Sequence, residues 1–138
     1  KGNYAMWWTP EDLENFRALS DEVAEYYDGQ EGFDGRMVDG RQTLGENIAD
    51  LGSLSCVTSI VGEDTEGLRR LFTQFAAIWA SKYTDEAMIR RLNTDVHSPA
   101  KVRVNAVLRN TDAFYLAYPQ LREGDKMYLA PEQRVGIW

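Results

Sequence analysis

Apolar residues recur at helical spacing along most of this chain. The strongest pattern has spacings of three, four and seven residues and predicts one core helix with a wide apolar face: Leu68, Leu71, Phe72, Phe75, Ile78 and Trp79. Another helix is predicted over about 10–27, because Thr9 can cap it and Pro10 suits its first position. Three further helices are expected, over 85–92, from Ser98 or Pro99 onward, and from a Thr111 cap to Pro119.

Glycines concentrate between residues 28 and 45, where helical spacing fades. The stretch 36–44 resembles a short extended pair turning at Asp39-Gly40. From Glu46 a helix is expected to run to just before Gly62, interrupted or tightened at Gly52. The sequence therefore predicts a mainly α protein with at most a short β pair near 36–44, in one domain over residues 1–138.

Composition and charge exclude several classes of protein. The chain has 138 residues, is 43% hydrophobic and carries a net charge of -7, so nucleic acid is not an expected partner. It has no apolar run of about 18 to 20 residues, so no membrane span is expected. The single cysteine, Cys56, cannot form an intrachain disulfide; we expect it to be a buried thiol. A bacterial cytoplasmic origin fits this cysteine usage.

A few charged residues could carry chemistry. Glu46 and Asp50 are four residues apart and would project from one face of a helix. His97 is the only histidine, and Arg103 follows it by six residues, within reach of the same helix end. A histidine and an arginine that converge could stabilise an oxyanion and hold a carbonyl or carboxylate. The alternative is a set of unrelated, solvated charges on helix surfaces.

Four separated motifs, in order, carry a resemblance to a known family. They are Gly45-Glu46-Asn47-Ile48-Ala49-Asp50; the aromatic run 72–79; Thr94-Asp95-Val96-His97-Ser98-Pro99 followed by Arg103-Val104-Asn105; and the run 125–131 continued to Trp138. Together they resemble the C-terminal part of the neprilysin-type zinc endopeptidases, in the bacterial oligoendopeptidase branch of the gluzincins. The resemblance implies the helical C-terminal portion of a thermolysin-like catalytic domain. Within this likeness, the segment 54–68 is shorter than the family's.

The resemblance also implies roles for individual residues. Glu46 would be the third zinc ligand, and Asp50 would orient a zinc-bound histidine. His97 would donate to the oxyanion formed during peptide hydrolysis, and Arg103 would bind a substrate carbonyl on the primed side. Two residues match positions that line the S1′ pocket, which prefers large apolar side chains: Ile78 and Trp79.

The zinc site implied by the resemblance is incomplete in this sequence. The family's His-Glu-x-x-His helix supplies two zinc ligands and a general base, whereas this chain has one histidine. We therefore expect the chain to begin just downstream of that helix, to be inactive alone, and to need the upstream part of its own polypeptide as well as peptide substrates. Without that partner, Glu46 and Asp50 are expected to be exposed, and the fragment is expected to self-associate or to leave local segments mobile.

Two other functions remain open at this stage. One is a non-catalytic helical binding module or pseudoenzyme domain that retains the same residues as structure. The other is a helical domain in which Glu46 and Asp50 merely cap and solvate a helix; there, the two acids would lie far from His97.

Overall fold

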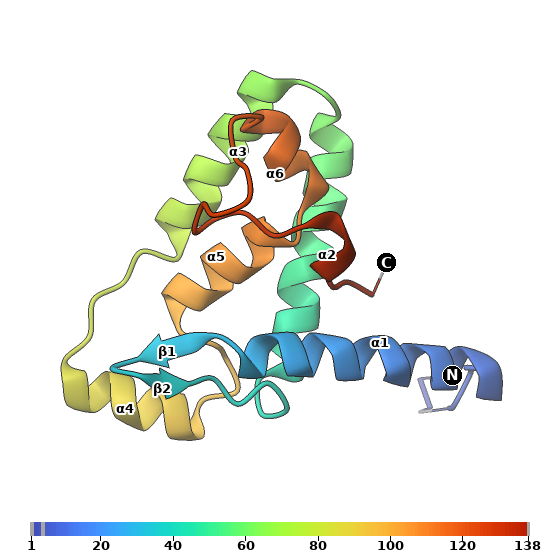
Figure 1. The fold of residues 1–138 in the computed structure, drawn as a ribbon. Helices are drawn as coiled ribbons and strands as arrows, with labels where there is room; N and C mark the ends of the chain where they lie inside the picture. The colour runs from blue at the N-terminus through green and yellow to red at the C-terminus, as the bar shows by residue number, and fades with distance from the viewer. Residues whose placement is uncertain (1, 4, 138) are drawn as a thin grey trace.

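The computed structural model describes residues 2–3 and 5–137, and over these the chain is mainly helical, as predicted (Figure 1). The helices and strands in chain order are α1 (Pro10–Asp28), β1 (Glu31–Phe33), β2 (Arg36–Met37), α2 (Leu44–Val61), α3 (Thr65–Ile78), α4 (Asp85–Thr94), α5 (Ala100–Arg109), α6 (Asp112–Ala117) and the 3₁₀ turn η1 (Pro131–Gln133). Trp138, which closes the last motif, lies outside the described residues.

Helix α1 begins as its sequence predicts. The Thr9 hydroxyl accepts a hydrogen bond from the Asp12 backbone N–H at 3.1 Å, and Pro10 occupies the first helical position. None of residues 10–19 is buried, and this half of the helix projects beyond the rest of the molecule in Figure 1. The second half is anchored by Val23 and Tyr27, both 0% exposed. Helix α1 therefore joins the core only through its C-terminal half.

The β hairpin lies earlier in the chain than the pattern predicted. Strand β1 pairs antiparallel with β2, and the turn is Asp34-Gly35, whose φ angles are 49° and 71°. Both turn residues thus have the positive φ that a tight hairpin needs. The predicted turn at Asp39-Gly40 is wrong: the Asp39 carboxylate instead accepts a hydrogen bond from the Gln42 N–H at 2.8 Å, in the turn that leads into α2.

Gly40 is required by a close approach between two backbones. A Cβ atom added there would lie 2.0 Å from the carbonyl oxygen of Ala24 in α1, and the Gly40 N–H donates to Asp28 Oδ1 at 2.7 Å. We expect Gly40→Ala to lower the free energy of unfolding by about 3 kcal/mol, because the backbone must move to relieve the overlap. Gly45→Ala is the matched control: its Cβ meets nothing within 4 Å, and alanine favours the helix. Urea denaturation of both variants compares them, and equal midpoints would contradict the prediction.

Helix α2 runs through the centre of the fold without the interruption predicted at Gly52. It ends at Gly62, where φ is 66°. Its inner side buries Leu51 and Leu54, but its outer side remains apolar and uncovered, with Ile60 84% exposed. Cys56 lies on this exposed side, so the expectation of a buried thiol is wrong.

Helices α3, α5 and α6 pack together and complete the hydrophobic core. Phe72 of α3 meets Phe114 of α6 edge to face, with ring centroids 5.6 Å apart. Helix α4 ends at Thr94, two residues later than predicted, and α6 ends before Pro119 as expected. The Thr111 hydroxyl does not cap α6, because it donates to the Val107 carbonyl instead.

The C-terminal segment docks on this core, as predicted. The Tyr115 hydroxyl accepts a hydrogen bond from the Leu129 N–H at 2.9 Å, and the Arg134 guanidinium lies 3.8 Å from the Tyr115 ring centroid. Leu129 itself is 8% exposed. Across residues 2–3 and 5–137, none of the helices combines the length and apolar character needed to cross a bilayer.

Candidate functional site

Two acids of α2 meet two bases that come from far along the chain. Glu46 Oε2 lies 3.1 Å from His97 Nε2, and Asp50 binds Arg103, 53 residues later in the sequence. The acids lie one helical turn apart, and the bases lie just before and within the first turn of α5. This convergence argues against two unrelated acids that merely solvate a helix.

The Asp50–Arg103 pair is bidentate and buried. Arg103 Nε donates to Asp50 Oδ2 at 2.6 Å and Nη2 donates to Oδ1 at 2.7 Å, while the two residues are 7% and 9% exposed. Burial alone would lower the pKa of Arg103, but the hydrogen bonds and charge of Asp50 outweigh it, and the pKa is raised. The expectation that Asp50 is exposed is therefore wrong, because Arg103 covers it within the chain.

Trp79 and Tyr27 enclose this ion pair. The Arg103 guanidinium lies 3.8 Å from the centroid of the Trp79 ring, a stacking distance that fixes its plane. The Tyr27 side chain is fully buried, and its hydroxyl has no hydrogen-bond partner among the described residues. Burial is the main cause that raises the pKa of Tyr27. The pair is thus held in a water-poor environment.

His97 is held between two carboxylates. Its Nδ1 lies 2.7 Å from Asp95 Oδ1, and its backbone N–H donates to the same oxygen at 3.0 Å. Since Nε2 lies against Glu46, a carboxylate positions the ring at each of its two nitrogens. A ring nitrogen held in this way can donate a hydrogen bond to a negative oxygen.

Asp95 is the positioning residue that the sequence analysis missed. Partial burial raises the pKa of its carboxyl, but the His97 hydrogen bonds and the Arg91 charge, 2.5 Å away, outweigh burial and the pKa is lowered. Its contribution to stability is therefore present above the ordinary pKa of aspartate and is lost as the pH falls. Its place two residues before His97 was the available signal.

A buried network joins α2 to the start of α5. The Ser98 hydroxyl donates to Asn47 Oδ1 at 2.8 Å, and Asn47 Nδ2 donates to the Thr43 hydroxyl at 2.9 Å. Asn47 is 1% exposed and Ser98 3%. These contacts fix the distance between the residues that flank them, Glu46 and His97.

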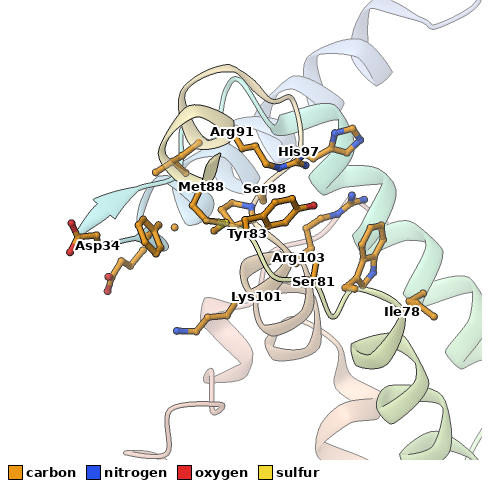
Figure 2. Close-up of a pocket in the computed structure, with 17 residues that line it drawn as sticks. Asp34, Ile78, Ser81, Tyr83, Met88, Arg91, His97, Ser98, Lys101 and Arg103 are labelled. Carbon is orange, nitrogen blue, oxygen red and sulfur yellow. The ribbon is translucent and has the colours of Figure 1, made fainter. Parts of the chain in front are cut away.

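The bases open onto a pocket of about 450 Å³. Figure 2 shows Arg103 and His97 at one end and Tyr83 and Met88 across its centre. Ile78 and Trp79 line this pocket and also a smaller, largely apolar one of about 340 Å³ between α2 and α3. Ile78 is 71% exposed, so the end of the predicted core helix belongs to the pocket wall.

The residues described in the structure contain no group of three or more histidine, cysteine, aspartate or glutamate side chains placed to hold a metal ion. The Glu46 side chain is 41% exposed and carries a carboxylate of the kind that binds zinc. Asp50 lies one turn away with both oxygens already accepting a hydrogen bond. The site can thus offer one zinc ligand, and a zinc ion would need further ligands from outside these residues.

Comparison with known proteins identifies the family. Peptidase family M13 matches residues 1–135, and a neutral endopeptidase of Lactobacillus helveticus is 36% identical over 137 residues, covering 99% of this chain and 21% of its own length. The crystal structure of PepO from Lactobacillus rhamnosis superposes with a TM-score of 0.92 at 35% identity, covering 99% of this chain and 22% of that one. The zinc metalloprotease Zmp1 of Mycobacterium tuberculosis, solved with an inhibitor, gives 0.87 at 35% identity, with 97% and 23% covered.

The chain therefore belongs to Peptidase family M13, the neprilysin family, and corresponds to its C-terminal region. It spans about a fifth of the length of the relatives that it matches.

Proposed function

We propose that this chain is the part of a zinc endopeptidase that completes the metal site and holds the peptide bond to be cleaved. The observation that carries the proposal is the paired convergence on α2, where Glu46 meets His97 and Asp50 meets Arg103. Membership of a peptidase family and likeness to a zinc metalloprotease support the reaction class. The peptide substrates and the activity belong to a longer polypeptide.

Glu46 would be the zinc ligand that this chain supplies. Its carboxylate is half-exposed, whereas Asp50 is buried behind it. Zinc, when bound, would supply Lewis-acid polarisation of the scissile carbonyl. Each Asp50 oxygen can accept more than one hydrogen bond, so Asp50 can also orient a histidine ligand from the upstream part of the polypeptide.

His97 and Arg103 would act on the peptide itself. Asp95 holds the imidazole ring so that Nε2 faces Glu46, where negative charge would develop on the peptide oxygen. Arg103 uses two of its five N–H groups on Asp50, which leaves three for a backbone carbonyl of the substrate. Ile78 and Trp79 would contact a large apolar side chain next to that carbonyl.

Zinc binding tests the proposal. We expect a version extended upstream through the missing part of the catalytic domain to bind one zinc ion in calorimetry, and this chain alone to bind none. Glu46→Gln should weaken zinc binding of the extended chain by at least about tenfold, because the amide is a neutral and poorer ligand. Glu63→Gln, an exposed acid outside the site, is the control and should bind zinc normally.

An extended chain that binds no zinc would contradict the proposal. It would favour a pseudoenzyme or helical binding module instead. A Glu46→Gln variant with unchanged zinc affinity would remove Glu46 from the ligand set while leaving the family membership intact.

A further inference from the structure

Another pocket, of about 200 Å³, lies on the other side of α5 from Asp50. Lys101, Asn105 and Arg109 line it at spacings of four residues, so they form one row along the helix. Lys126, from the segment after α6, adds a third cation to its wall. The pocket is thus basic, in a chain whose net charge is -7.

None of these three cations is paired within the described residues. Neither Lys101, Arg109 nor Lys126 has a carboxylate oxygen among them within 4.0 Å. Acids are abundant in this chain, 22 against 15 basic residues, and several other arginines are paired. An unpaired basic cluster is therefore not a result of a shortage of acids.

Arg109 shows the clearest unmet bonding capacity. Its Nε atom is buried and has no hydrogen-bond partner among the residues that the structure describes, and its Nη1 reaches Gln30 Oε1 only at 3.4 Å. A buried donor without a partner costs free energy unless a ligand or water completes it. By contrast, the Arg103 guanidinium pairs with the Asp50 carboxylate and stacks on the Trp79 ring. The Arg109 guanidinium thus has no anionic partner among the described residues and could bind one in the pocket.

The basic pocket adjoins the large pocket of the candidate site. Glu31 and Lys101 line both, and Figure 2 shows Lys101 leaving α5 in a different direction from Arg103. The Glu31 carboxylate accepts a hydrogen bond from the Gly35 N–H at 2.9 Å within the hairpin. Arg103 and Arg109 are six positions apart on α5, which is an axial rise of about 9 Å, and they leave the helix on different sides. A peptide that reaches both must therefore span more than about three extended residues.

We propose that the pocket lined by Lys101, Arg109 and Lys126 binds a side-chain carboxylate of the peptide substrate, on a residue more than about three positions away from the residue whose carbonyl Arg103 holds. The inference rests on the proposed peptidase function and adds a preference for acidic peptides. The carboxylate would receive charge-assisted hydrogen bonds from the Arg109 guanidinium, with the two lysines adding attraction.

Matched peptides test this subsite in the full-length zinc-loaded enzyme. A quenched fluorescent peptide carries one Glu, moved through successive positions on either side of the cleavage site, and each peptide has a Gln twin. We expect kcat/KM for Glu to exceed that for Gln by about fivefold to tenfold at one position, and the preference to shrink with added salt. Equal rates for Glu and Gln at every position would overturn the proposal.

Variants assign the preference to the pocket. Arg109→Gln and Lys126→Gln should each reduce the Glu preference at least threefold while the Gln peptides are cleaved as before. Arg17→Gln, an exposed cation on the projecting half of α1, is the control and should keep the preference. A preference that survives Arg109→Gln and Lys126→Gln would overturn the assignment. Lys126 is exposed, so its variant stays informative if Arg109→Gln fails to fold.

Two further readouts separate the possible failures. If an acid elsewhere in the polypeptide fills the pocket, Arg109→Gln will lower the melting temperature and no Glu preference will exist, which overturns the proposal. Fluorescence anisotropy measures binding of labelled Glu and Gln peptides without turnover. If no peptide is cleaved, the proposed function fails, yet tighter binding of the Glu peptide that depends on Arg109 would still support the subsite.

Discussion

Replacing Asp50 by alanine should lower the free energy of unfolding by about 3 to 5 kcal/mol, because the change leaves the Arg103 guanidinium buried and unpaired. Both partners of this ion pair are less than a tenth exposed, so water can take the place of the lost carboxylate only in part. Urea denaturation of the chain measures the loss.

The double variant Asp50→Leu with Arg103→Met separates the cost of an orphaned charge from the worth of the pair. It should be more stable than Asp50→Ala, since two apolar side chains replace both charges. A matched single change at the exposed pair, Asp21→Ala, should cost less than about 1 kcal/mol, because Arg41 remains solvated. If Asp50→Ala and Asp21→Ala had the same effect, the Asp50–Arg103 pair would not be structurally important.

Replacing His97 by alanine should lower kcat of the intact enzyme by about 10²- to 10³-fold with little change in KM, because one donor to the developing oxyanion is lost. Steady-state kinetics on a neutral peptide measure the effect. Zinc content must stay unchanged, since His97 lies 3.1 Å from the proposed ligand Glu46 and a disturbed metal site would also lower the rate.

Asp95→Asn tests how His97 is held. The amide can no longer accept with a full negative charge, so kcat should fall by about 10- to 100-fold, less than for His97→Ala. An unchanged kcat in His97→Ala would remove the imidazole from the reaction. A loss in Asp95→Asn equal to that in His97→Ala would instead mean that the orientation of the ring accounts for its whole contribution.

Helices were the part of the fold that local sequence could predict. Thr9 and Pro10 mark the start of α1, and periodic apolar residues mark α3, because capping and amphipathic packing depend on residues a few positions apart. The hairpin turn was harder, because the chain holds three Asp-Gly pairs within residues 28–40, and two of them, Asp34-Gly35 and Asp39-Gly40, carry the same local signal for a turn. Contact of Gly40 with the Ala24 backbone decided between them.

The residues of the candidate site were likewise found partly from the sequence and partly from the structure. Glu46 and Asp50 were recognised from their spacing, and with His97 and Arg103 they were assigned roles by resemblance to a family. The structure brings all four together. It also shows what the spacing could not: Asp50 is buried, Cys56 is exposed, and Asp95 holds the imidazole.

The sequence by itself determined the helical class, the approximate limits of α1 and the family. Only the tertiary structure decided which charges are paired, which remain without a partner, and which pockets they line. The physical reason is that capping and periodicity act over one or two helical turns, whereas the pairing of Asp50 with Arg103 spans 53 residues. Burial of that pair follows from how α2 and α5 pack.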